Sequence, residues 1–326
     1  MVIETSNGFR RAVAAGAQAW GSVFPGSLGG ERFPPGRAIS TRTVWGYYLD
    51  YTHKTRAHGA ATPELLPSVG VIQLALGWWE SSLGGPGPET ERFLESCELA
   101  LARAETRGDA LLWPVLTPVA KFGLRPPWHS ALLQGQAASI FVRAHKLTGE
   151  SRWGAAARAA VAPLLEPRGE LVTATRSGPI LEEAPSDPAS HILNGWISAL
   201  WGVRDVAVAQ GDDRAHAVFA ASAGALRDHL PVYDTGWWTL YSLFPHALPD
   251  LAKPIYHAVH ADQIEVLHRL TGIVEFRDAA VRWRGYQRRG VTAAVVAQKL
   301  LFTAVDGRRR RRRPGFDRNA NKRSAR

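Results

Sequence analysis

The sequence contains one cysteine, and its hydrophobic residues form no long segment. Because Cys97 has no second cysteine to pair with, the chain can form neither an internal disulfide nor a cysteine-based metal site, and a buried free thiol is expected there. No run of 18 apolar residues occurs, which argues against a membrane-spanning helix. Residues 1–24 also lack the continuous apolar stretch of a secretory signal. We therefore expect a cytoplasmic protein without a membrane span.

Several widespread catalytic motifs are missing as well. The chain has no phosphate-binding G-x-x-x-x-G-K-[ST] loop, no dinucleotide-binding G-x-G-x-x-G and no G-x-S-x-G nucleophile motif. His257 and His260 are three residues apart, but no H-E-x-x-H or similar carboxylate motif completes a metal site around them. The sequence therefore predicts no cofactor and no metal.

The positive charge is concentrated at one end of the chain. The formal net charge is +10, and residues 308–326 carry +9 of it, through nine arginines and one lysine against one aspartate. The remaining 307 residues are therefore almost neutral. The six arginines of Arg308–Arg313 would bind anionic polymers non-specifically, with a strong dependence on salt. A solvated tail without a partner explains them equally well, and either way we expect residues 308–326 to be disordered.

Apolar residues make up 45% of the chain and recur at three- and four-residue spacing after Pro67, which predicts helices. The clearest helix is expected over Ser130–Leu147. Another is expected to begin after Pro67 and to end at the Gly- and Pro-rich segment 84–88. Further helices are expected near residues 89–106, 151–165, 188–209, 213–229, 261–271 and 274–287, with short β segments near 44–51 and 169–182. Antiparallel helix pairs favour a mainly α fold, an (α/α) toroid or incomplete barrel with short β-hairpins. The expected organisation is an N-terminal arm with a short β segment over 1–66, an α/α catalytic domain over 67–290, a C-terminal segment over 291–307 and the tail over 308–326.

Four segments concentrate polar and aromatic residues at the expected starts of helices: residues 128–136, 181–196, 230–241 and 256–263. In an α/α toroid the loops that enter the inner helices lie at one end of the central cavity, so these segments would form a groove of the size of a sugar. Twelve of the 30 aromatic residues are tryptophans, whose rings stack well on sugars. Taken singly, each segment is equally compatible with helix caps, turns and satisfied polar groups.

Taken together, the four segments resemble the C-terminal catalytic domain of the D-glucuronyl C5-epimerases between about residues 67 and 287. The matching motifs are Trp128-His129-Ser130-Ala131, Gln134-Gly135-Gln136-Ala137, Glu182-Glu183-x-Pro185, Leu193-Asn194-Gly195, Tyr233-Asp234-Thr235-Gly236, Tyr241, and Tyr256-His257-x-x-His260-x-x-Gln263. Enzymes of this family convert glucuronate to iduronate within heparan-type polysaccharides, without a cofactor.

The resemblance implies a mechanism and a set of site residues. Glu183 and Tyr256 would exchange protons with C5 on opposite faces of the sugar ring, and Tyr241 matches a second catalytic tyrosine. The positions that would bind or orient a uronate-containing polysaccharide are Trp128, His129, Gln134, Gln136, Asn194, Tyr233, His257 and His260. The family also forms dimers, so a homodimer is expected.

Three positions depart from the family pattern. Ala184 follows the catalytic glutamate where the family has tyrosine, His129 stands in place of another tyrosine, and Phe244 replaces an arginine three residues after Tyr241. Loss of an arginine that would hold sulfate or carboxylate favours an unsulfated substrate. Lys253 and His246 are the candidates to replace it. A polysaccharide lyase on the same fold and a glycan-binding protein that has lost catalysis remain alternatives.

Overall fold

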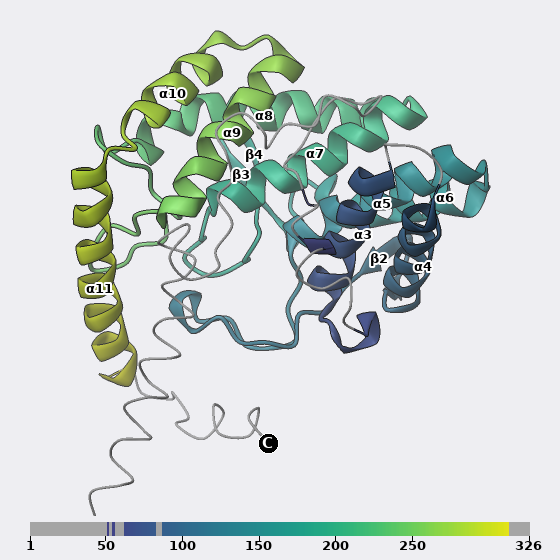
Figure 1. Ribbon diagram of the computed structural model, residues 1–326, viewed down its shortest axis with the longest axis horizontal. Coiled ribbons are helices and arrows are strands. Elements are labelled where there is room, and N and C mark those ends of the chain that lie inside the picture. The colour runs from purple at the N-terminus through teal and green to yellow at the C-terminus, as the bar shows by residue number, and fades with distance from the viewer. Residues whose placement is uncertain (1–50, 52–53, 56–61, 83–86, 313–326) are drawn as a thin grey trace, which may run out of the picture.

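A computed structural model describes residue 51 and residues 54–55, 62–82 and 87–312 of the chain (Figure 1). The described part is mainly helical with two short β-hairpins, which confirms the predicted fold class. Of the β segment predicted over 44–51, residues 44–50 lie outside the described residues, as do residues 313–326 of the tail. None of the helices in the described ranges is long and apolar enough to cross a membrane.

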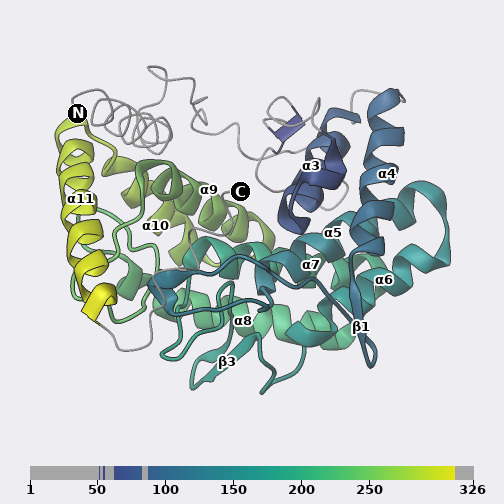
Figure 2. The ribbon, with the colours of Figure 1, turned by 90° about the horizontal axis from the view of Figure 1, so that it is seen from below.

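Eight of the helices form four successive pairs. The pairs are α3 (Ser68–Ser82) with α4 (Pro88–Ala102), α5 (Ala131–Thr148) with α6 (Ser151–Val161), α7 (Leu193–Gln210) with α8 (Asp213–Tyr233), and α9 (Pro254–Thr271) with α10 (Val274–Gly285). The first members also contact one another in the order α3, α5, α7, α9. They therefore form a continuous inner row, as an incomplete α/α barrel requires (Figures 1 and 2).

Three of the four pairs reverse direction over a two-residue connection that begins with glycine. Gly149, Gly211 and Gly272 have φ angles of 74°, 63° and 74°. Each N–H donates to the carbonyl four residues earlier, in a left-handed cap that glycine adopts without steric cost. These turns place the outer helix of each pair directly against its inner partner.

The two central inner helices pack backbone against backbone. A Cβ atom on Gly135 of α5 would lie 2.5 Å from the Cα atom of Ala199 on α7, and one on Gly202 would lie 2.1 Å from the Gly135 carbonyl oxygen. Since no side chain fits between them, α5 and α7 approach closely. The residues at their N-terminal ends therefore lie close together.

The hairpins and short helices complete the frame. Antiparallel pairs are formed by β1 (Glu105–Arg107) with β2 (Ala110–Leu112), and by β3 (Val172–Thr175) with β4 (Gly178–Leu181), which confirms the hairpin predicted over 169–182. Short 3₁₀ helices are η1 (Pro63–Leu65), η2 (Ala120–Phe122) and η3 (Ala162–Leu164). Cys97 is a buried free thiol in α4, as expected.

Two predicted helix starts were wrong. The helix expected from residue 188 begins at Leu193, because the preceding loop is held by the side chain of Glu182, which accepts hydrogen bonds from the backbone N–H and ring of His191. The helix expected from residue 261 begins at Pro254, since proline is well suited to the first turn of a helix. The segment from Tyr256 is therefore helical.

Helix α11 (Arg289–Arg312) follows the four pairs and lies at the edge of the molecule away from α3 and α4 (Figures 1 and 2). Val295 on this helix packs with Trp238 and Leu251. The helix continues to Arg312, so the predicted disorder from Arg308 was wrong for these first five residues. Arginine is a good helix former, and extending an existing helix needs no new nucleation.

Candidate active site

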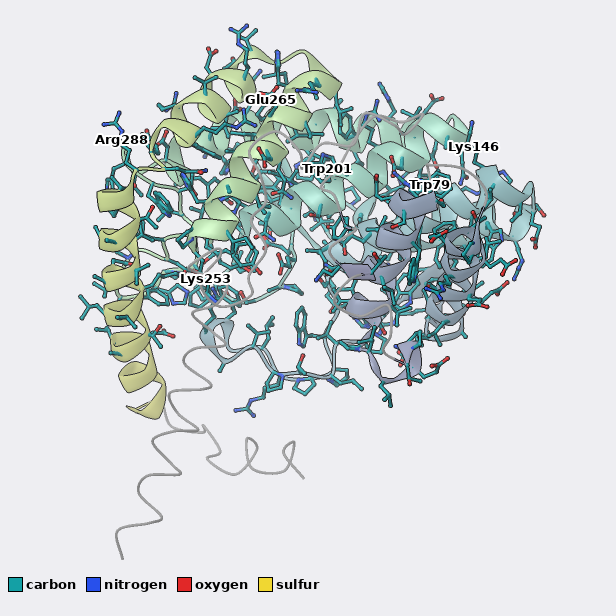
Figure 3. The ribbon with its side chains drawn as sticks, in the orientation of Figure 1. Trp79, Lys146, Trp201, Lys253, Glu265 and Arg288 are labelled. Carbon is teal, nitrogen blue, oxygen red and sulfur yellow. The ribbon has the colours of Figure 1, made fainter. Side chains whose placement is uncertain are left out.

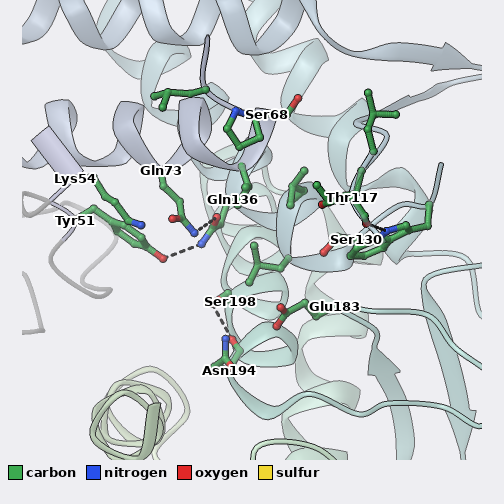
Figure 4. A pocket seen from close by; sticks show the side chains of 18 of the residues that line it. Tyr51, Lys54, Ser68, Gln73, Thr117, Ser130, Gln136, Glu183, Asn194 and Ser198 are labelled. Carbon is green, nitrogen blue, oxygen red and sulfur yellow. Dashed lines mark hydrogen bonds between the residues drawn. The ribbon is translucent and has the colours of Figure 1, made fainter. Parts of the chain in front are cut away.

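A cavity of about 940 Å³ lies among the inner helices (Figure 4). Three of the four predicted segments supply lining residues: Trp128 and Gln136 from the first, Glu183 and Asn194 from the second, and Tyr256 from the fourth. The structure thus brings together five predicted site residues. The first and last of them, Trp128 and Tyr256, are 128 positions apart in the sequence. The segment over 230–241 does not line the cavity, but its last residue lies next to it.

Glu183 is the second residue after the β3–β4 hairpin, following Glu182, and its carboxyl group is largely shielded from solvent. Its Oε2 atom is buried and has no hydrogen-bond partner among the described residues. Burial raises the pKa of Glu183 to about 7, against an opposing effect of the Lys121 ammonium group. A carboxyl group with this pKa exchanges protons readily at neutral pH.

The glycine of the Leu193-Asn194-Gly195 motif makes room for this carboxyl group. A Cβ atom on Gly195 would lie 2.0 Å from Oε2 of Glu183, far inside van der Waals contact. Gly195 is the third residue of α7, so the carboxyl group lies against the first turn of that helix. The motif therefore has a packing explanation: only glycine permits this position of Glu183.

Two tyrosines lie near Glu183. Tyr256, in the first turn of α9, lines the cavity, and its ring is 5.2 Å from that of Tyr241 between centroids, at 66°. Burial and the charge of Glu183 raise the pKa of both phenols. Both therefore hold their protons at neutral pH and can donate them.

A third tyrosine was not predicted as a site residue. Tyr51 lines the cavity, where its hydroxyl oxygen accepts a hydrogen bond of 2.7 Å from Nε2 of Gln136 (Figure 4). Gln73 of α3 in turn donates to Oε1 of Gln136 at 3.3 Å. Burial raises the pKa of Tyr51. The aromatic run that ends at Tyr51 was the only signal in the sequence, and it carried no spacing motif.

The cavity wall formed by α7 and α9 offers unused acceptors. Gln263 donates from Nε2 to the Asn194 carbonyl oxygen at 3.1 Å and to the Ser198 hydroxyl at 3.2 Å. The side-chain oxygens of Asn194 and Gln263 have no partner among the described residues, although both are buried. Buried acceptors of this kind suit a ligand with hydroxyl donors, such as a sugar.

Three predicted binding residues lie elsewhere. Gln134 donates to the carbonyl oxygens of Leu111 and Ala160, both at 2.7 Å. Tyr233 is fully buried and donates to the His191 carbonyl oxygen. His129 contacts the Glu170 carboxylate, 3.2 Å away. None of the three lines the cavity, and each makes contacts within the fold.

The other two predicted histidines also lie outside the cavity lining. His257 stacks on Trp238 at 3.8 Å and contacts the Thr239 hydroxyl and the Trp283 carbonyl oxygen. His260 contacts the same hydroxyl at 3.1 Å. Burial lowers the pKa of His257 to about 4, so this ring is neutral at physiological pH. In the part of the chain that the structure describes, no three His, Cys, Asp or Glu residues form a group that could hold a metal ion.

Phe244, which stands where the family has an arginine, lies among other aromatic rings. Phe244 packs edge-on against Phe122 at 5.4 Å, and His246 lies among these rings and Phe302. Of the two proposed replacements, Lys253 lines the cavity at the start of α9 (Figure 3), whereas His246 does not. Lys54 lines the cavity as well.

The family model of the D-glucuronyl C5-epimerase C-terminus matches residues 111–285, which is more than half of the chain. The chain belongs to this family. A D-glucuronyl C5-epimerase of Caenorhabditis elegans is 33% identical over 186 residues, which cover 51% of this chain and 30% of that protein. An uncharacterized protein of Methanocaldococcus jannaschii is 23% identical over 180 residues, covering 53% and 57% respectively.

The resemblance noted in the sequence is therefore confirmed at the level of the family. The chain spans less than two thirds of either relative's length. The matched region contains Glu183, Tyr241 and Tyr256, whereas α3, α4 and α11 lie outside it. Gln73 and Tyr51, which complete the cavity, also precede the match.

Proposed function

We propose that this member of the epimerase family is an isomerase that inverts C5 of D-glucuronate residues in a polysaccharide, giving L-iduronate. One observation carries the proposal: a carboxyl group with one buried oxygen that has no hydrogen-bond partner among the described residues lines the same cavity as a protonated phenol. Inversion at carbon requires proton removal from one face and delivery to the other, so a base and an acid must lie on opposite sides of the ring.

In this mechanism Glu183 takes the C5 proton, and the electron pair of the C–H bond moves into the adjacent carboxylate to give an enolate-like intermediate. Tyr256 then donates its proton to the opposite face of C5. Glu183 leaves the cycle protonated and Tyr256 deprotonated, and exchange with water restores both. The reverse reaction exchanges their roles. Phenol and amide donors around the cavity, such as Tyr51 and Gln73, are of the kind that stabilises the developing negative charge.

The lining charges favour an unsulfated uronate polymer. The cavity residues with positive charge are Lys54, Arg103 and Lys253, against Glu64 and Glu183. Arg103 already donates to the carbonyl oxygens of Leu66 and Glu64. Two lysines remain, which suits one carboxylate in each repeating unit better than several sulfates. We therefore propose a heparosan-like polymer as the substrate.

The test is proton NMR in deuterated water with unsulfated heparosan and its sulfated derivatives. We expect deuterium at C5 and iduronate signals, fastest with the unsulfated polymer. Glu183→Gln and Tyr256→Phe should each lower exchange by at least about 100-fold. Normal exchange in both variants would refute the site assignment.

Two other outcomes would redirect the proposal. Chain cleavage with an unsaturated uronate product would identify a polysaccharide lyase, which begins with the same proton abstraction. Binding of the polymer without any exchange would identify a glycan-binding protein.

A further inference from the structure

Lys121, which belongs to none of the sequence motifs, lies next to the candidate site. It is in η2, between β2 and α5. Its ammonium nitrogen is 4.1 Å from the ring centroid of Tyr241 and 4.6 Å from that of Phe122. The side chain is 24% exposed. The cation therefore lies over the ring of Tyr241 in a cation–π arrangement, and the same ring contacts Tyr256.

Asp250 fixes both Lys121 and Tyr241. Its Oδ2 atom is 2.9 Å from Nζ of Lys121, and its backbone carbonyl accepts a hydrogen bond of 2.6 Å from the N–H of Tyr241. The same buried carboxylate also accepts from Lys299 of α11 at 2.6 Å and from Ser242 at 2.7 Å. Two ammonium groups therefore share one carboxylate. His246 also lies 4.0 Å from the Asp250 carboxylate and 3.5 Å from that of Asp306.

The positive charge of Lys121 acts on the candidate base. The groups that interact electrostatically with Glu183 are Lys121 and the phenols of Tyr51, Tyr241 and Tyr256. Lys121 is the cation in this set, and it lowers the pKa of Glu183 against the effect of burial. The pKa of Lys121 itself is lowered, chiefly by burial and also by the charge of Lys299, although Asp250 and Glu183 act to raise it.

We propose that Lys121 is a positioning residue for the proposed reaction: its ammonium group orients the ring of Tyr241, which contacts Tyr256, and brings a positive charge to this side of the site. This inference depends on the proposed function. It also explains the departure at Phe244, since that ring packs on Phe122, directly beside Lys121. The charge that an arginine would bring from the position of Phe244 thus comes from a distant part of the chain.

The pH dependence of exchange tests this role. Proton abstraction requires ionised Glu183, so the rate should rise with pH through about 7 in the wild-type protein. Lys121→Met removes the cation, which should move this rising limb of the pH–rate profile to higher pH by roughly 0.5–1 unit. The rate at pH 6 should then fall by about 3- to 10-fold. Lys121→Arg should restore the wild-type limb. If Lys121→Met does not fold, Lys121→Gln, which can still donate to Asp250, should show the same shift.

Lys299→Met is the matched control. It removes the other lysine bound to Asp250 but leaves Lys121 in place, so the limb should not move even if the melting temperature falls. An unshifted pH profile in Lys121→Met and Lys121→Gln, or an equal shift in Lys299→Met, would overturn the inference.

A second measurement separates this inference from the proposed function. Titration of the glutamate side-chain carbons by ¹³C NMR, with the Glu183 signal assigned by its absence in Glu183→Gln, needs no substrate. Absence of exchange in the wild-type protein would refute the proposed function alone. An unchanged titration of Glu183 in Lys121→Met would refute the role of Lys121 alone.

Discussion

Two sides of the same helix, α9, differ in how their polar groups are used. Tyr256 and Gln263 line the cavity, and the side-chain oxygen of Gln263 has no partner among the described residues. His257 lies next to Tyr256 in the sequence but stacks on Trp238, and both of its ring nitrogens have partners. Residues of one motif therefore divide between a cavity wall and a packed core.

The comparison separates catalytic potential from structural need. A buried polar atom without a partner costs stability, so it is tolerated where a ligand can supply the missing bond. Glu183, Asn194 and Gln263 have such atoms and line the cavity. His257 and Tyr233 are polar and buried too, but their hydrogen bonds join elements of the fold. Gln134 joins elements of the fold through its Nε2 atom, although its Oε1 atom has no partner among the described residues. The predictions below test this distinction, from the largest expected effect to the smallest.

Gly195→Ala should have the largest effect, since it acts directly on Glu183. The new methyl group would occupy the position of the carboxyl group, and moving that group should lower C5 exchange by about 100-fold or more. Gly224→Ala in α8 is the control, because no atom lies within 4 Å of its Cβ position. That variant should gain about 1 kcal/mol in the free energy of unfolding and keep full activity. Equal activity in both variants would contradict the assignment of Glu183.

The cavity wall and the packed core should also contribute to stability with opposite dependences on pH. Glu183 has a pKa raised to about 7, so the folded state binds more protons than the unfolded state, and this contribution to stability is lost as pH rises from about 4.5 to 7. His257 has a pKa lowered to about 4, so its contribution is present above about 6.5 and is lost as pH falls toward 4. Each contribution amounts to at most about 3 kcal/mol.

Melting temperatures between pH 4 and 8 measure these contributions. Glu183→Gln should remove the loss of stability on raising the pH, and His257→Phe should remove the loss on lowering it. The histidine variant should keep its exchange activity wherever it is folded. A pH profile that neither substitution changes would show that other groups govern stability in this range.

The sequence was sufficient for the fold and for part of the site. Helical spacing predicted Ser130–Leu147, and the observed helix is Ala131–Thr148. The family motifs identified Glu183, Tyr256, Gln136, Asn194 and Trp128, which do line the cavity. Spacing alone could not show which residues of a motif face the cavity, because polar residues of the same motifs also pack the core. Lys121 lay beyond sequence reasoning, since it meets Tyr241 only through the folding of η2 against the loop before α9.

Gln134 and Gln136 provide the finest test, because they are the same residue type two positions apart on α5. Gln136 bonds to Tyr51 and Gln73 in the cavity, whereas Gln134 bonds to the backbone of Leu111 and Ala160. Gln136→Ala should raise KM for the proposed polymer by roughly 5- to 10-fold, since about 1 kcal/mol of hydrogen bonding is lost from the cavity wall that the proposal places against the sugar. Gln134→Ala should leave KM unchanged and lower the free energy of unfolding by about 1–3 kcal/mol, because it strands two buried carbonyl groups. Steady-state exchange kinetics and urea unfolding of the two variants, measured side by side, would contradict the division between cavity wall and core if the effects were equal or reversed.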